Sequence, residues 1–467
     1  MSAPIEQLYQ LYLTHPTIST DTRKIAAGSL FFALKGEKFD ANTFAEQAIA
    51  AGAAYAVIDN PAYQLDEKYI LVDDVLTTLQ ELARHHRRKL TIPLIGLTGS
   101  NGKTTTKELI STVLAQKFKT QFTQGNLNNH IGVPLTILTI DSTDEIAVIE
   151  MGANHQKEIE LLCSIAQPTH GLITNVGKAH LEGFGGVEGV KKGKGELYDY
   201  LKQSKGKKEG VAFINHDNEI LRRMEMARGL DQVIYYGTTP DHNNLVTAEL
   251  TANSPYLSIE WKNQKSGLSH AAKTQLTGAY NLDNIIAAIC IGVYFGISDE
   301  DINQGIEGYQ PKNNRSQIVQ TATNTLICDY YNANPSSMAV AIENMENLVA
   351  EKKVLILGDM FELGDEAAAE HEAIIQKALD IKAYQTIFIG SEFVKAGTML
   401  KGQPSSPPLL ELSPTNSGHK SRGSHEITFY KTADEAIARL KTNPITHATI
   451  LIKGSRGMAL ERLVGLF

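Results

Sequence analysis

A glycine-rich turn between a buried strand and a helix places the strongest constraint on this chain. Residues 92–97 form an apolar strand pattern, and Thr98-Gly-Ser-Asn-Gly-Lys-Thr-Thr105 follows where a helix is expected to begin. Glycines let backbone N–H groups point inward at phosphate oxygens, and the helix N-terminus adds partial positive charge. Lys103 can reach the outer phosphates, and the Thr104 hydroxyl can bind Mg²⁺. The turn therefore predicts a phosphate-binding loop in an α/β domain.

This loop departs from the usual phosphate-loop pattern, GxxxxGK[ST], at one position. Leu97 stands where the first glycine belongs, so the match is reduced to GxxGKTT. The alternative is a purely structural strand–helix turn, but that interpretation leaves a lysine at the start of the helix unexplained.

Polar side chains follow the ends of the next expected strands. Glu150 ends one apolar strand, and His180 comes shortly after the strand expected at 169–174. The carboxyl ends of parallel strands face the crevice where ligands bind, which makes Glu150 a candidate Mg²⁺ ligand. A lone histidine is usually structural, yet this position favours a role in the site. Three lysines follow that either serve a phosphate site or coat a solvated face: Lys191, Lys192 and Lys194.

The length of the chain and the order of its expected elements indicate three domains. A chain of 467 residues holds about three domains of ~150 residues. We place the domains at 1–89, 90–311 and 312–467. Strands alternate with helices in all three, which predicts α/β folds, with a mostly parallel sheet in the second.

The expected strands cover 29–34, 55–58, 92–97, 145–150, 169–174, 256–261, 325–329, 353–357, 386–389 and 447–452. The expected helices cover 42–52, 75–89, 156–165 and 281–294, with another starting near 103. The strand at 256–261 is expected to be antiparallel. The charge run at 84–89 is interpreted as a solvated helix end or linker. Residues 403–425 have the composition of a loop and are assigned no chemistry.

Composition excludes several classes of protein. The formal charge of -8 argues against non-specific binding to nucleic acid or anionic membranes. Three scattered cysteines form neither a disulfide framework nor a zinc motif. No basic region precedes an apolar stretch at the N-terminus, so no secretory signal is expected. The longest apolar run, 285–297, is too short to span a bilayer and predicts a buried helix. We expect a cytoplasmic protein without membrane insertion.

Several segments together resemble one known family. They are Thr98 to Thr105, Glu150, Ile173-Thr-Asn-Val-Gly-Lys-Ala-His180, Lys194-Gly-Glu196 and Gly278-Ala-Tyr-Asn-Leu-Asp-Asn284. In this combination and order they resemble the Mur ligases, ATP-dependent enzymes that form amide bonds in peptidoglycan synthesis. The match runs along essentially the whole chain. The resemblance implies three α/β domains: a small N-terminal domain for the UDP end of the substrate, a central P-loop ATPase and a C-terminal Rossmann-like domain.

The resemblance also implies which residues bind ATP. The phosphates fall to the loop, namely Gly99, Ser100, Asn101, Gly102, Lys103, Thr104 and Thr105. Asn281 and Asn284 match the asparagines beside adenine, although Tyr280 stands where the family usually has histidine. Arg315 and Asp329 match the arginine and aspartate that contact the nucleotide.

Two Mg²⁺ ions are implied in the same way. Thr104 and Glu150 resemble the ligands of the first ion, and His180 resembles a ligand of the second. The carbamylated lysine of the family falls on Lys194, where Gly193 replaces the usual alanine. Carbamylation turns an ammonium group that would repel Mg²⁺ into an anionic oxygen ligand. The catalytic set implied is Lys103, Glu150, His180 and Lys194.

Substrate residues are implied at both ends of the chain. Thr22, Arg23 and Asn42 fall in the uridine-nucleotide segment, where Ala41-Asn42 replaces the usual Gly-His. The remaining matches, on the nucleotide-sugar side and near the amino-acid site, are Asn128, Asn129, Asn332, Asn334, Lys453 and Arg456.

Two longer segments narrow the resemblance within the family. Residues 329–338 match DxYNANPxSM, and residues 358–364 match GDMxELG, both typical of the members that add D-alanyl-D-alanine. The implied substrates are UDP-N-acetylmuramoyl-tripeptide and D-alanyl-D-alanine, joined through an acyl phosphate. A monomer is expected, with the C-terminal domain closing onto the central one.

Three other interpretations stay open. A non-catalytic scaffold could retain the fold, but all four residues of the catalytic set are present. A family member with another acceptor is disfavoured by the segments at 329–338 and 358–364. A P-loop kinase would not need the third domain.

Overall fold

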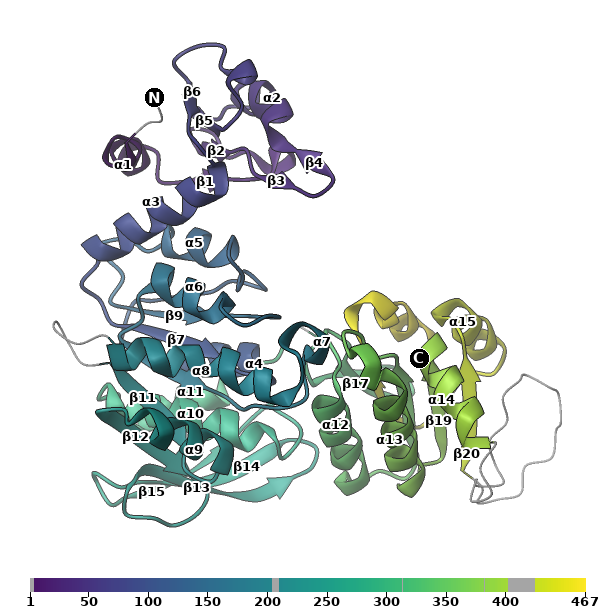
Figure 1. Cartoon of the computed structure of the whole chain (residues 1–467). Coiled ribbons are helices and arrows are strands. Elements are labelled where there is room, and N and C mark those ends of the chain that lie inside the picture. Colours follow the sequence, from purple (N-terminus) through teal and green to yellow (C-terminus); the bar gives the residue numbers. More distant parts are fainter. Residues whose placement is uncertain (1–3, 204–209, 313, 382, 402–424) are drawn as a thin grey trace.

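The computed structural model describes residues 4–203, 210–312, 314–381, 383–401 and 425–467. Three α/β bodies follow one another along the chain, and the central one contacts both of the others (Figure 1). Each body is built around its own sheet, of four, nine and six strands. The predicted fold class is confirmed. The expected loop at 403–425 lies outside the described residues except for His425.

The N-terminal sheet is small and parallel, in the order β1-β2-β5-β6. Its strands are β1 (Ile18–Ser19), β2 (Leu30–Phe32), β5 (Tyr55–Ile58) and β6 (Tyr69–Leu71), with a separate hairpin of β3 (Lys35–Gly36) and β4 (Phe39–Asp40). The helices are α1 (Ile5–Thr14), α2 (Ala45–Ala50) and α3 (Val75–Lys89). Because β2 and β5 are buried on both faces, they are apolar almost throughout.

The central sheet has the order β15-β14-β13-β12-β11-β10-β7-β9-β8. Its strands are β7 (Leu94–Thr98), β8 (Thr120–Phe122), β9 (Ile146–Glu150), β10 (His170–Ile173), β11 (Val211–Asn215), β12 (Gln232–Gly237), β13 (Asn244–Asn253), β14 (Leu257–Asn263) and β15 (Ser269–Lys273). All pairs from β8 to β13 are parallel, and β14 and β15 continue the sheet antiparallel. The antiparallel addition predicted at 256–261 is confirmed as β14.

The central helices are α4 (Lys103–Leu114), α5 (Gly132–Ile137), α6 (Glu158–Ala166), α7 (Leu181–Phe184), α8 (Val187–Gln203), α9 (Glu219–Arg228), α10 (Asn281–Tyr294) and α11 (Asp299–Glu307). Helix α10 packs on α4, and its residues from Ile285 to Val293 are all buried. The apolar run at 285–297 is therefore a core helix with a short extension. Among the described residues, none of the helices has both the length and the apolar character that a bilayer crossing requires.

The C-terminal sheet has the order β16-β17-β21-β18-β19-β20, with only the edge strand β16 antiparallel. The strands are β16 (Gln317–Gln320), β17 (Thr325–Asp329), β18 (Lys353–Gly358), β19 (Gln385–Ile389), β20 (Glu426–Tyr430) and β21 (Thr449–Lys453). The helices are α12 (Pro335–Asn347), α13 (Ala367–Asp380), α14 (Ser391–Lys401) and α15 (Ala433–Thr442). An open parallel sheet with helices agrees with the Rossmann-like expectation.

The charge run at 84–89 is a helix end, as predicted, but only Arg88 and Lys89 are exposed to solvent, which corrects part of the sequence interpretation. It ends α3, and His86 and Arg87 are buried where α3 packs on α5 and α6 (Figure 1). Arg87 donates from Nε to Ala166 O (2.9 Å) and from Nη2 to Gln167 O (3.2 Å). The last carbonyls of a helix lack partners within it, so these cationic donors satisfy the end of α6.

His86 is held in the same interface as a neutral ring. Its Nε2 bonds Ile140 O at 2.7 Å, and the Tyr9 hydroxyl lies 3.3 Å from Nδ1. A carbonyl accepts only, so Nε2 carries the proton and Nδ1 accepts from Tyr9. Burial is the main cause that lowers the pKa of His86. The N-terminal and central domains are therefore joined by a buried polar contact.

Sheet order places the candidate site. Strand β7 lies between β10 and β9, so the segments that follow these three strands are neighbours at one sheet edge. They carry the glycine-rich turn, Glu150 and the segment leading to His180. Parallel pairing alone therefore gathers the three sequence signals.

Candidate active site

The glycine-rich turn takes a conformation that only glycine adopts without strain. Gly99 has φ 146° and Gly102 has φ 77°, and Gly102 is the N-cap of α4. A Cβ on Gly99 would lie 2.0 Å from Thr174 Oγ1, and one on Gly102 would lie 2.6 Å from Asn284 Oδ1. Strain and contact thus both require glycine at these two positions.

The segment after β10 holds this turn in place. Asn101 N donates to Asn175 Oδ1 (3.0 Å), and Thr174 Oγ1 donates to Asn101 O (2.6 Å). Ser100 N donates to Asn175 O (2.9 Å). Protein hydrogen bonds alone therefore hold the phosphate loop in shape, which is the pre-organisation that electrostatic stabilisation needs.

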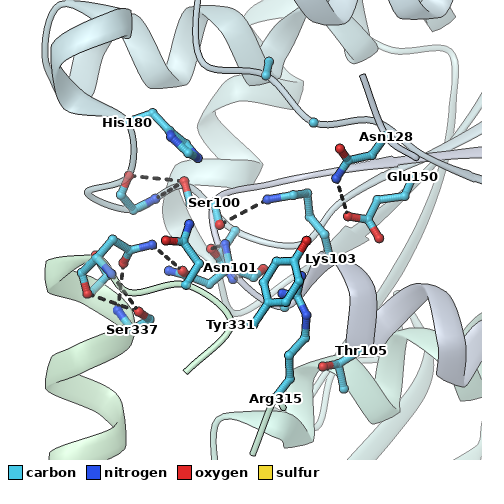
Figure 2. A pocket seen from close by; sticks show the side chains of 18 of the residues that line it. Ser100, Asn101, Lys103, Thr105, Asn128, Glu150, His180, Arg315, Tyr331 and Ser337 are labelled. Carbon is cyan, nitrogen blue, oxygen red and sulfur yellow. Dashed lines mark hydrogen bonds between the residues drawn. The ribbon is translucent and has the colours of Figure 1, made fainter. Parts of the chain in front are cut away.

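Lys103 begins α4 and lines the cavity beside the turn. Its Nζ donates to Gly99 O at 2.8 Å and Ser100 O at 3.3 Å (Figure 2). Burial lowers the pKa of Lys103 to about 8, while Glu150 opposes that shift and Arg315 adds to it. In this state the ammonium group is held by loop carbonyls, within reach of a phosphate at the turn.

Thr104 and Glu150 meet, as the sequence predicts for two ligands of one metal ion. The Thr104 hydroxyl lies 3.2 and 3.0 Å from the two carboxylate oxygens of Glu150. Asn128 donates from Nδ2 to Glu150 Oε1 at 2.8 Å (Figure 2). Lys107 Nζ lies 4.0 Å from Glu150 Oε2. The buried carboxyl group of Glu150 thus has a hydroxyl, an amide and an amine around it.

The structure distinguishes among the three lysines that the sequence could not separate. Lys194 is 1% exposed, whereas Lys192 is exposed and Lys191 pairs with Glu188 on the surface of α8. Lys194 Nζ donates to Ala153 O (3.2 Å) and lies 5.1 Å from the centre of the Phe184 ring. Burial, and then the charge of Lys103, hold its pKa well below the ordinary value.

His180 lines the same cavity from the start of α7. Its φ of 52° is left-handed, which is rare for a residue with a side chain. Its Nδ1 bonds the carboxylate of Glu362, a residue of the C-terminal domain. Sequence reasoning found His180 but missed Glu362.

The wall predicted to hold the nucleotide is built from α10 and the start of the C-terminal domain. Asn284 accepts at Oδ1 from Thr106 Oγ1 (2.9 Å) and donates from Nδ2 to Asn281 Oδ1 (2.8 Å). The Arg315 guanidinium carbon lies 3.8 Å from the Tyr331 ring centre, and Arg315 Nε is buried with no hydrogen-bond partner among the described residues. The structure therefore leaves an unused donor on a cation of this wall.

Asp329 and Lys453 are brought together at the ends of β17 and β21. Lys453 Nζ lies 2.6 Å from Asp329 Oδ2, and its side chain is 2% exposed. The Arg456 guanidinium carbon lies 5.3 Å from the centre of the Tyr331 ring, the same ring that Arg315 contacts. The segment predicted near the amino-acid site and Arg315, predicted to contact the nucleotide, thus share the ring of Tyr331, which sequence reasoning did not select.

Contacts across the cavity join the central and C-terminal domains. Asn334 donates from Nδ2 to Asn101 Oδ1 (2.8 Å), and Lys178 N donates to Ser336 Oγ (3.0 Å). Lys178 Nζ also pairs with Glu370. The phosphate loop is thereby tied directly to the N-terminus of α12.

One cavity of about 830 Å³ gathers most of the predicted site (Figure 2). Its lining includes Ser100, Asn101, Gly102, Lys103, Thr105, Asn128, Asn129, Glu150, His180, Asn281, Asn284, Arg315, Asp329, Asn332, Asn334 and Lys453. Gly99 and Thr104 lie directly behind this lining, and Lys194 reaches it through its bond to Ala153 O.

The three predicted substrate residues of the N-terminal domain lie away from this cavity. Arg23 is exposed and pairs with Asp21 at 2.7 Å, beside Thr22. Asn42 is fully buried, and its Nδ2 donates to Asp40 Oδ1 (2.7 Å) and Asp59 Oδ1 (2.8 Å). In this structure the Asn42 amide stabilises its own domain, and a role for it in binding substrate stays a prediction.

Models of known protein families match all three domains of the chain. Family models match residues 16–87 (Mur ligase family, catalytic domain), 97–292 (Mur ligase middle domain) and 314–456 (Mur ligase, glutamate ligase domain). The chain belongs to the Mur ligase family. The resemblance stated from the sequence is confirmed, and the phosphate loop and Glu150 lie in the match to the middle domain.

Individual Mur ligases extend the likeness over nearly the whole chain. The UDP-N-acetylmuramoyl-tripeptide–D-alanyl-D-alanine ligase of Bacillus subtilis is 36% identical, covering 96% of this chain and 92% of that protein. Its Escherichia coli counterpart is 33% identical, with 97% and 93% covered. A crystal structure of MurF from Acinetobacter baumannii has a TM-score of 0.82 at 29% identity, covering 100% and 98%. MurF from Thermotoga maritima, in complex with ADP, gives 0.79 at 25% identity, with 97% of each chain covered.

Proposed function

We propose that this chain is an ATP-dependent ligase that joins D-alanyl-D-alanine to UDP-N-acetylmuramoyl-tripeptide in peptidoglycan precursor synthesis, and so serves cell-wall biogenesis. The observation that carries the proposal is that one cavity is lined by residues of both the central and the C-terminal domain. In it, the phosphate loop with Lys103 and Glu150 faces Asn332 and Lys453 of the C-terminal domain. Such a cavity can hold a nucleotide and an acyl acceptor side by side.

The reaction balances in two steps. A carboxylate oxygen of the tripeptide attacks the γ-phosphorus of ATP, the bond to the bridging oxygen breaks, and ADP leaves. The amine of D-alanyl-D-alanine then attacks the acyl phosphate, an amide bond forms, and phosphate and a proton leave. Both steps depend mainly on positioning and on neutralising charge. The buried Lys103 and the amides of residues 99–105 are suited to the phosphates, with Asn281, Asn284, Arg315 and Asp329 beside the rest of the nucleotide.

Residues at the cavity fit Mg²⁺. Mg²⁺ prefers hard oxygen ligands and is usually held by one or two carboxylates together with substrate phosphates, rather than by a cage of protein groups. Thr104 Oγ1 and the Glu150 carboxylate supply such oxygens 3.0 Å apart beside the phosphate loop, and His180 lines the same cavity. Within the described ranges, no group of three or more histidine, cysteine or acidic side chains is arranged to hold a metal ion. Bound Mg²⁺ would offset the negative charge that meets at the γ-phosphate.

The surroundings of Lys194 fit a carbamylated lysine. Carbamylation needs a neutral amine, whose nitrogen attacks the carbon of CO₂ and loses a proton to leave an anionic carbamate. Burial lowers the pKa of Lys194 and so favours that neutral amine. Lys194 lies on α8 and donates to Ala153 O at the cavity wall, so a carbamate on it would supply anionic oxygens at the edge of the cavity.

The two substrates would reach the cavity from different domains. The UDP end is assigned to the N-terminal domain, with Thr22, Arg23 and Asn42, and the sugar side to Asn128 and Asn129. D-alanyl-D-alanine is assigned to the C-terminal wall, with Asn332, Asn334, Lys453 and Arg456. The domain boundaries at 89/90 and 311/312, a cytoplasmic location and a monomeric state belong to the same proposal.

Trapping the acyl phosphate tests this mechanism. With ATP, Mg²⁺, the UDP-tripeptide and hydroxylamine but no acceptor, we expect the hydroxamate of the tripeptide together with ADP and phosphate. Hydroxylamine attacks acyl phosphates in place of the amine. Mass spectrometry of the product is the measurement, and a reaction without ATP is the control. A parallel reaction with D-alanyl-D-alanine shows whether the enzyme ligates normally. If it does, and no hydroxamate forms at any hydroxylamine concentration, an acyl phosphate that hydroxylamine can reach would be contradicted.

A further inference from the structure

One distinctive segment of the chain does not line the cavity. Residues 358–364, Gly-Asp-Met-Phe-Glu-Leu-Gly, follow the end of β18, and none of them is part of the cavity lining. The segment instead contacts α7 of the central domain. Glu182 N donates to Glu362 O (3.4 Å), and a Cβ on Gly364 would lie 3.4 Å from Glu182 Cβ.

The side chain of Glu362 reaches past α7 to His180. Its carboxylate bonds His180 Nδ1, and His180 is part of the cavity lining. Both partners have left-handed backbones, with φ 62° for Glu362 and φ 52° for His180. Such conformations cost of order 1 kcal/mol or more for residues with side chains and persist only where the surroundings hold them. The contact is therefore maintained against a local cost on both sides.

This bond decides which ring nitrogen can serve a ligand. A carboxylate accepts hydrogen bonds only, so Nδ1 must carry a proton. A neutral ring then presents its lone pair at Nε2, and no described residue makes a hydrogen bond to that atom. Histidines that bind metals typically donate their other N–H to a carboxylate or carbonyl, which fixes ring orientation and tautomer.

Other bonds hold the Glu362 segment from behind. Phe361 N donates to Ser455 Oγ (3.0 Å), and Ser455 N donates to Asp359 O (3.1 Å). Met360 N donates to Nε2 of His371, whose Nδ1 bonds Ala367 O at 2.7 Å. The segment is thus a fixed part of the C-terminal domain and is bonded to the strand end that carries Lys453.

We infer that Glu362 is a positioning residue, which orients His180 from the opposite domain so that Nε2 faces the metal-binding side of the cavity. The inference rests on the proposed function, which assigns His180 to a metal. Because Glu362 belongs to the C-terminal domain, the histidine is oriented only when that domain lies against α7. Domain closure thereby completes the site through a hydrogen bond, in addition to bringing substrates together.

The test compares two interdomain carboxylates. Glu362 touches His180, whereas Glu370 pairs with Lys178 across the same interface. Glu362→Ala and Glu370→Ala each remove one contact between the domains, but only the first releases the histidine. The Glu362 side chain is 53% exposed, so its replacement leaves no buried cavity. Glu362→Gln keeps an oxygen that can accept from Nδ1–H and serves as the conservative variant.

The main readout is the affinity of the full-length protein for Mn²⁺. It is measured by electron paramagnetic resonance in the presence of a non-hydrolysable ATP analogue and the UDP-tripeptide. Glu362→Ala should weaken one class of Mn²⁺ site by about 10- to 100-fold, the range typical for loss of an outer-shell partner. Glu370→Ala should change the affinity of either class of Mn²⁺ site by less than about threefold. The affinity of Glu362→Gln should lie between those of the wild type and Glu362→Ala.

Nitrogen-15 spectra of the histidine rings in metal-free protein provide the second readout. The His180 ring, assigned by His180→Asn, should carry its proton at Nδ1 in the wild type and lose that preference in Glu362→Ala. The inference would be overturned if both alanine variants weakened Mn²⁺ binding equally. It would also be overturned if the proton of the His180 ring stayed at Nδ1 in Glu362→Ala. Failure of the proposed function itself would differ, because the wild type would then form no ATP-dependent ligation product.

Discussion

Lys103→Ala is expected to lower the rate of ATP-dependent phosphate release by about 100- to 1000-fold, the loss typical when one pre-organised donor to a developing charge is removed. Lys103 is the cation of the phosphate loop, and its Nζ already lies 2.8 Å from Gly99 O at the turn. Alanine would leave the γ-phosphate without this donor while retaining the fold of α4. Phosphate release at saturating ATP and UDP-tripeptide is the measurement.

The matched control for this variant is Lys117→Ala. Lys117 follows the same helix, is exposed, and donates to Gly296 O at 2.7 Å away from the cavity. It should retain wild-type turnover. Full turnover by Lys103→Ala would remove this lysine from the reaction, and equal loss in both variants would indicate damage to α4.

Lys194→Ala is expected to lose about 100-fold in activity, at the upper end of the range for changes around metal sites, and to recover part of it with formate or acetate. The small carboxylate would occupy the space left by the side chain and replace the carbamate oxygens. Lys191→Ala and Lys192→Ala are the controls, because these lysines of α8 do not enter the core and should remain active without rescue.

Carbon-13 spectroscopy with labelled CO₂ checks the modification independently of turnover. A carbamate signal that is present in the wild type and absent from Lys194→Ala is expected. An unmodified wild-type lysine, or a fully active Lys194→Ala variant, would exclude Lys194 from metal binding.

Much of the fold could be predicted because its signals are local. The helices at 75–89 and 281–294 and the strands at 55–58 and 325–329 agree with the structure to the residue. Long periodic or fully apolar segments carry their own signal. The short strands β1, β3, β4 and β6 and the strands β8, β11, β12, β13, β15, β16 and β20 were not predicted. Several of them are only partly buried, and their polar residues obscure the pattern.

The part of the site that lies at the ends of parallel strands could be predicted from the sequence. Three consecutive strand ends led to Lys103, Glu150 and His180, and the sheet places those ends side by side. The choice of Lys194 came from the resemblance, since only burial separates it from Lys191 and Lys192. No local signal marks such a difference.

Contacts between segments that are distant in the chain could not be predicted from the sequence. Arg87 in the charge run at 84–89 is buried because the end of α6 accepts its hydrogen bonds, a partner 79 residues away in the chain. Asn42 is buried for a similar reason, because its amide also donates to Asp59, which is 17 residues away in the chain. Glu362 stood in a distinctive segment, yet only tertiary structure shows that it contacts His180, 182 residues away. Residue type and spacing cannot encode such pairings on their own.

The most direct measurement is phosphate release from ATP and UDP-N-acetylmuramoyl-tripeptide with different acceptors. D-alanyl-D-alanine, D-alanine alone, other single amino acids and no acceptor are compared at saturating ATP and Mg²⁺. The proposed function predicts rapid release only with D-alanyl-D-alanine, matched mole for mole by a UDP-pentapeptide product. Release driven equally well by a single amino acid, or release with the dipeptide but without a pentapeptide product, would contradict it.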